Sequence, residues 1–160
     1  MTGFYKKMIG ALIGLSRAAY SAPRTPELYD VLSAGLSADE PADEGEIIAL
    51  TAKAAALKHQ FSPNCGICAN PCGRTDDYDL SRIETAEPTV RDQKTALLFG
   101  LQDLARRYRE APDKEASNLQ PAKDLLLDGL CVLGEDYDAE TLSLYVKKAA
   151  EIVATLQKSS

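Results

Sequence analysis

Hydrophobic positions recur at helical spacing along almost the whole chain, and no stretch keeps a strict alternation of hydrophobic and polar residues. About six helices with mostly short connections follow from this pattern, and four of them are long enough to form the core of a bundle. The sequence therefore predicts an all-α fold, a helical bundle. The expected helices cover residues 3–20, 25–35, 43–61, 88–110, 119–133 and 138–157, with a short turn around 77–83.

Residues with known preferences for helix ends support these bounds. Thr25 and Asp138 can each cap the start of a helix, and Pro26 suits a first turn, where its missing N–H costs nothing. Gly35 and Gly134 are expected to end the second and fifth predicted helices.

The first predicted helix has an apolar stripe, expected to be buried, that comprises Phe4, Met8, Leu12, Leu15 and Ala19. Its two lysines followed by apolar residues also resemble the start of a secretory signal, so a signal or membrane-surface helix is the alternative. The stripe favours a core helix. No run of about 20 apolar residues exists, so the sequence predicts no membrane-spanning helix.

Residues 119–133 differ from the other predicted helices because they are apolar on nearly every side. Leu125, Leu126 and Leu127 are followed by Leu130, Cys131, Val132 and Leu133. A helix without a polar face is typical of the centre of a bundle.

The chain has 160 residues and a mass of 17.3 kDa, which suits a single domain over residues 1–160. Within it, residues 1–60 form extra N-terminal helices, 62–75 a cysteine-rich loop between the third and fourth long helices, and 88–157 the bundle core. The formal net charge is −6. This excess of acidic residues argues against a nucleic-acid partner, because there is no positive charge to release counterions from phosphates.

Three of the four cysteines lie within eight residues, as Cys65-x2-Cys68-x3-Cys72. Crowded cysteines do not close the long loops of a secreted disulfide framework, and they suit thiolates that converge on one metal centre in a reducing cytoplasm. Gly66 and Gly73 allow the backbone to approach such a centre closely. We expect an iron–sulfur cluster, most readily [4Fe–4S], with structural zinc as the alternative.

Both metal sites usually have four protein ligands, so a fourth is needed. Cys131 is the first candidate, provided that its helix passes beneath the loop, and His59 is the second. Less specific interpretations stay open: Cys65 and Cys68 as a redox dithiol, the cysteines as buried thiols, and His59 as a solvent-facing residue at a helix end.

Two segments carry a family resemblance. Residues 94–105, Lys-Thr-Ala-Leu-Leu-Phe-Gly-Leu-Gln-Asp-Leu-Ala, and residues 125–149, with Tyr137-Asp138 between two helices, resemble the helical domain of the hybrid-cluster proteins. That domain is shared in outline with the nickel carbon-monoxide dehydrogenases. The resemblance implies a helical bundle with a cysteine loop that ligates a [4Fe–4S] cluster.

The chain also departs from this family. The family's cysteines lie at its N-terminus with wider spacing, whereas 60 residues precede them here. The large α/β domains that hold the family's second cluster are absent from this sequence. The resemblance therefore does not imply reductase activity.

The sequence as a whole predicts a small iron–sulfur protein for electron transfer or redox sensing, acting beside a redox partner protein. No residue is marked as catalytic. The alternative is a non-enzymatic helical interaction module whose cysteine loop holds structural zinc or no metal.

Overall fold

The computed structural model describes residues 3–20, 24–38, 43–61 and 81–158. Within these ranges it contains seven α-helices, one 3-10 turn and no strand, so the expected all-α bundle is confirmed. The elements are α1 (Gly3–Ala19), α2 (Pro26–Ser37), α3 (Glu44–Phe61), α4 (Ser81–Glu84), α5 (Pro88–Glu110), η1 (Ser117–Leu119), α6 (Gln120–Leu133) and α7 (Ala139–Lys158).

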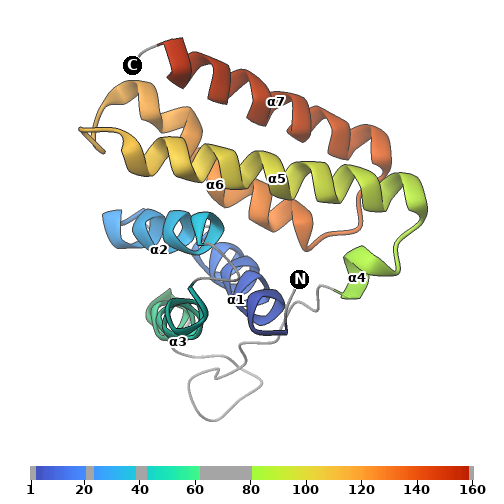
Figure 1. Cartoon of the computed structure of the whole chain (residues 1–160), viewed down its shortest axis with the longest axis horizontal. Helices are drawn as coiled ribbons and strands as arrows, with labels where there is room; N and C mark the ends of the chain where they lie inside the picture. Colours follow the sequence, from blue (N-terminus) through green and yellow to red (C-terminus); the bar gives the residue numbers. More distant parts are fainter. Residues whose placement is uncertain (1–2, 21–23, 39–42, 62–80, 159–160) are drawn as a thin grey trace.

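The helices form two groups that pack on each other. In Figure 1, α5 and α7 run side by side in the same direction, and α6 runs in the opposite direction behind them. Helices α1, α2 and α3 lie below this group, with α1 and α2 in contact with α5 and α6. The chain thus forms one core that includes helices from both sides of the cysteine-rich segment.

Polar side chains cap three of the helices. The Thr25 hydroxyl accepts a hydrogen bond from the N–H of Leu28 at 3.4 Å, and the Asp138 carboxylate accepts one from the N–H of Thr141 at 2.8 Å. At the start of α5, the Glu87 carboxylate accepts from the N–H of Thr89 at 3.2 Å. These bonds satisfy N–H groups that have no partner inside the first turn, which is why these helices begin at their expected residues.

Gly35 does not end α2, contrary to expectation, because the helix continues to Ser37. A Cβ atom at position 35 would lie 2.6 Å from Cδ1 of Leu12. Glycine at position 35 therefore allows α2 to approach α1 closely. In the sequence, this packing requirement resembles a signal for the end of a helix.

The buried face of α1 is confirmed except at its first member. Met8, Leu12 and Ala19 are fully buried, whereas Phe4 is 49% exposed. Tyr5 takes the buried place instead, and its hydroxyl accepts a hydrogen bond from the side-chain amide of Gln102 on α5. Tyr5 thus connects α1 with α5, and the buried face of α1 begins at Tyr5 rather than at Phe4.

Helix α6 occupies the centre, as its composition predicts. It contacts α1, α2, α5 and α7. The side chains that fill these contacts are almost completely buried and comprise Leu125, Leu126, Leu127, Leu130 and Leu133. At Gly129, α6 approaches α5 so closely that a Cβ atom there would lie 2.6 Å from Cδ2 of Leu101.

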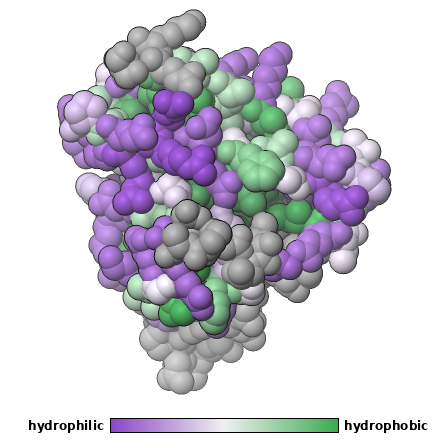
Figure 2. Space-filling view, viewed as in Figure 1, coloured by the Kyte–Doolittle hydropathy of each residue, from purple (hydrophilic) through white to green (hydrophobic). Residues whose placement is uncertain are grey.

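On the face shown in Figure 2, hydrophilic residues alternate with patches of hydrophobic ones. Phe99 and Leu144 are the most exposed of the large apolar residues that the structure describes, at 64% each. None of the described helices combines the length and the hydropathy that a membrane crossing requires.

The contact between Gly129 and Leu101 gives a first prediction. Gly129→Ala should lower the free energy of unfolding by about 1–3 kcal/mol, because the added methyl group would overlap the fully buried side chain of Leu101 and overpack the core there. Chemical denaturation followed by circular dichroism measures this change.

The matched control is Gly45→Ala in the first turn of α3, where a Cβ atom would meet nothing within 4 Å. Alanine there should leave stability unchanged or raise it by up to about 1 kcal/mol, since alanine is the better helix former. A Gly129→Ala variant as stable as the Gly45→Ala variant would contradict the packing described for α5 and α6.

Candidate functional site

Three of the four predicted ligands, Cys65, Cys68 and Cys72, lie outside the described residues. The segment that carries them joins Phe61 at the end of α3 to Ser81 at the start of α4. The predicted loop over residues 62–75 lies outside the described residues as well, so both the loop and the arrangement of its thiols stay predictions. The fourth predicted ligand, Cys131, is described in full.

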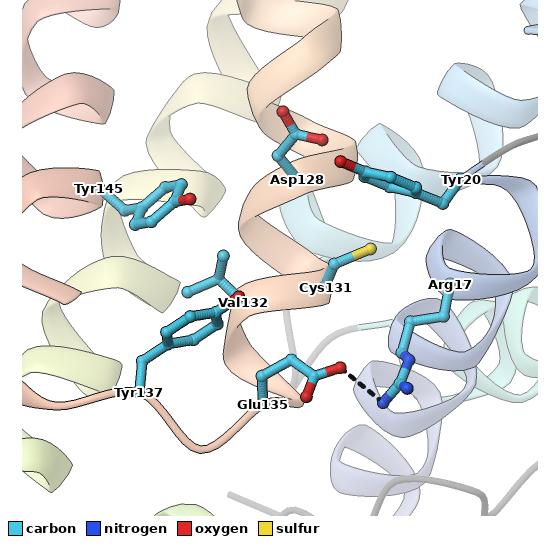
Figure 3. A pocket seen from close by; sticks show the side chains of 8 residues that line it. All are labelled: Arg17, Tyr20, Asp128, Cys131, Val132, Glu135, Tyr137 and Tyr145. Carbon is cyan, nitrogen blue, oxygen red and sulfur yellow. Dashed lines mark ion pairs between the residues drawn. The ribbon is translucent and has the colours of Figure 1, made fainter. Parts of the chain in front are cut away.

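Cys131 is a free thiol on the last turn of α6. It lines a cavity of about 320 Å³ at an edge of α6 that its neighbours leave open. Figure 3 shows α6 as the floor of this cavity, with Arg17 and Tyr20 from the end of α1 on one side and Tyr137 and Tyr145 on the other. Cys131 is only half-buried, in contrast to the leucines around it.

The environment of Cys131 keeps its thiol protonated at neutral pH. Burial and, to a smaller extent, the nearby carboxylate of Asp128 raise the pKa of Cys131 to about 11, while Arg17 acts in the opposite direction. A thiol must lose its proton to attack an electrophile or to bind a metal. Cys131 is therefore a weak nucleophile, and any metal that bound it would have to overcome this raised pKa.

The described residues around Cys131 do not complete a metal site. Across the part of the chain that the structure describes, no three or more His, Cys, Asp or Glu side chains come together in a group that could hold a metal ion. Cys131 could thus act as a metal ligand only together with residues from outside these ranges.

His59, the other candidate for a fourth ligand, lies in the last turn of α3, three residues before the undescribed segment begins. Its Nδ1 atom is buried, and among the described residues it has no hydrogen-bond partner. A buried polar atom without a partner is unusual, and an undescribed group or ion is a common explanation.

The cavity also brings together residues that the sequence analysis did not select. The Asp128 carboxylate lies on α6 with the hydroxyl group of Tyr20 beside it, and the hydroxyl group of Tyr145 points toward α6 from the opposite side (Figure 3). Below them, Nη1 of Arg17 and Oε1 of Glu135 form an ion pair at 2.9 Å (Figure 3). One edge of the central helix is thus polar and aromatic rather than apolar.

A weak signal for this edge exists in the sequence. Asp128 and Cys131 are spaced i, i+3, so they share one face of the apolar helix predicted over residues 119–133, and Glu135 follows just after that helix ends. The tyrosines carried no such signal, because Tyr20, Tyr137 and Tyr145 come from three separate places in the chain and only the packing brings them together.

Comparison with known proteins identifies no protein similar to this chain. No protein-family model, no curated protein and no solved structure matches this chain.

The raised pKa of Cys131, about 11, predicts slow alkylation of its thiol. At pH 8, iodoacetamide should modify Cys131 at least about tenfold more slowly in the folded protein than in the urea-unfolded protein, because the folded thiol holds its proton more tightly. Peptide mapping by mass spectrometry reads Cys131 separately from the other cysteines.

Asp128→Asn is the informative variant, since it removes a negative charge that raises the pKa of Cys131. It should speed the reaction in the folded protein and leave the rate in urea unchanged. Equal rates in folded and unfolded wild-type protein would show that the thiol is not held in its protonated form.

Proposed function

We propose that the protein binds an iron–sulfur cluster through Cys65, Cys68 and Cys72 and serves in electron transfer or redox sensing. The observation that carries this proposal is the spacing of the three cysteines, which lie within eight residues of one another in a segment with helices on both sides. Thiolates so close in sequence can reach a single soft metal centre without rearrangement of a fold.

The bundle suits a supporting role for such a loop. Helix α3 packs on α1 and α2, and α4 packs on α5, so both ends of the cysteine segment are attached to the bundle. A bound cluster would supply one-electron chemistry. The contribution of the protein would be to hold the ligands and to set the surroundings of the cluster, which tune its potential.

For the fourth ligand, the surroundings of the two candidates favour His59. Its buried Nδ1 has no partner among the described residues, so binding a metal would satisfy an atom that otherwise loses hydrogen bonding on folding. Cys131 would have to give up a proton that its environment stabilises. His59 also lies close to the cysteines in sequence, six residues before Cys65.

Structural zinc is the second candidate, and the same histidine supports it. Three cysteines and one histidine are a common ligand set for structural zinc. In that case the protein would be a non-enzymatic interaction module whose loop is stabilised by the metal.

This proposal includes a reducing, cytoplasmic location and, for the iron–sulfur form, a redox partner protein. It also includes a relationship between this bundle and the helical domain of the hybrid-cluster proteins, which rests on the residues quoted for it above. Neither the location nor the relationship is needed for the metal test.

Anaerobic purification followed by iron, sulfide and zinc analysis tests the proposal. We expect brown protein with broad visible absorption and matched iron and sulfide. Cys65→Ser, Cys68→Ser or Cys72→Ser should each abolish most of the bound iron, because each removes a thiolate ligand. Colourless wild-type protein with about one zinc per chain would support the second candidate instead.

The fourth ligand has its own pair of variants. His59→Ala should lower the iron content, His59→Cys should restore it, and Cys131→Ser should leave it unchanged. The reverse pattern, loss in Cys131→Ser and none in His59→Ala, would assign the fourth position to Cys131. Wild-type protein that contains neither iron nor zinc would overturn both candidates.

A further inference from the structure

We propose that the cavity beside Cys131 binds a small alkylammonium ion, whose ammonium group donates hydrogen bonds to Asp128, Tyr20 and Tyr145. The proposal uses none of Cys65, Cys68, Cys72 and His59, so it does not depend on the metal centre. It rests on hydrogen-bonding groups that face the cavity, on its charge and on its shape.

Three acceptor groups face the cavity without a hydrogen-bond or ion-pair partner among the residues that the structure describes. The Asp128 carboxylate forms no hydrogen bond or ion pair with any residue in the described ranges, and the hydroxyls of Tyr20 and Tyr145 form no hydrogen bond there either. Asp128 is half-buried, and desolvation raises its pKa, so its charge is poorly compensated. A primary ammonium group has three N–H donors and no acceptor, which matches this set.

The charges around the cavity favour a cation. Asp128 and Glu135 are the acids that line it, and Arg17, the one basic residue among the described lining residues, already pairs with Glu135. Farther out, Asp124 repels the Asp128 charge, while Arg24 and Lys148 partly offset it. The lining residues alone therefore carry one net negative charge, within a chain whose net charge is −6.

The rest of the cavity suits an alkyl chain. Val132 and the ring of Tyr137 lie next to each other below Asp128 (Figure 3). Aromatic faces also attract cations directly, and the protein places the guanidinium of Arg24 5.9 Å from the centre of the Tyr20 ring. With a volume of about 320 Å³, the cavity accepts a short amine and not a large cofactor.

Butylammonium is the probe, and 1-butanol is its neutral counterpart of the same chain length. Titration of the purified protein at pH 7, followed by heteronuclear NMR of the backbone amides, should give a dissociation constant of about millimolar for butylammonium, as expected for so small a ligand. Shifts should concentrate at α6 and at the start of α7. 1-Butanol should bind at least about tenfold more weakly, because it cannot compensate the charge of Asp128.

Two aspartates on one helix provide the matched comparison. Asp128→Asn should weaken butylammonium binding about tenfold or more, since it removes a charged acceptor. Asp124→Asn removes the same charge one turn earlier, at an exposed residue whose carboxylate bonds to Gln120 at 2.9 Å. There, the affinity should change by less than about threefold, because water and salt screen the interaction between an exposed charge and the bound ammonium group.

Tyr145→Phe provides a second, milder test that keeps the ring in place. It removes one acceptor and should weaken binding about threefold to tenfold without affecting the circular dichroism spectrum. The proposal is overturned if butylammonium does not bind, if 1-butanol binds equally well, or if Asp124→Asn weakens binding as much as Asp128→Asn.

Discussion

The burial of α6 is the constraint on which the rest of the structure depends. This helix has apolar side chains on nearly every side, so it can leave water only when other helices surround it. Each buried leucine contributes about 1.5–3 kcal/mol relative to an exposed one, so enclosing five of them outweighs any single polar contact in the bundle. Helices α1 and α2 from the N-terminal part and α5 and α7 from the C-terminal part provide the enclosure.

The same arrangement produces the cavity. The surrounding helices leave one edge of α6 uncovered, where Asp124, Asp128 and Cys131 reach the surface. Proximity to the packed core raises the pKa values of Asp128 and Cys131, because burial disfavours their charged forms. The burial that stabilises the bundle and the raised pKa values of Asp128 and Cys131 thus have one physical origin, the position of α6 at the centre.

The two functional proposals concern different parts of the molecule. The metal proposal rests on three cysteines whose spacing is visible in the sequence, and on a buried nitrogen of His59 that has no hydrogen-bond partner among the described residues. The amine proposal rests on Asp128 and on tyrosines that only the packing brings beside it. Cys131 links the two parts. The sequence suggests it as a metal ligand, whereas its surroundings in the structure keep it as a protonated thiol in a polar cavity.

Local features of this protein followed from its sequence alone. Helix bounds depend on hydrogen bonds between residues four apart and on caps such as Thr25 and Asp138, so neighbouring residues contain the necessary information. The apolar character of α6 likewise predicted its central place. Only the tertiary structure decided why Gly35 lies inside a helix, why Tyr5 is buried and Phe4 is not, and which tyrosines meet beside Cys131. These outcomes depend on contacts between segments far apart in the chain, and periodicity within one segment carries no information about them.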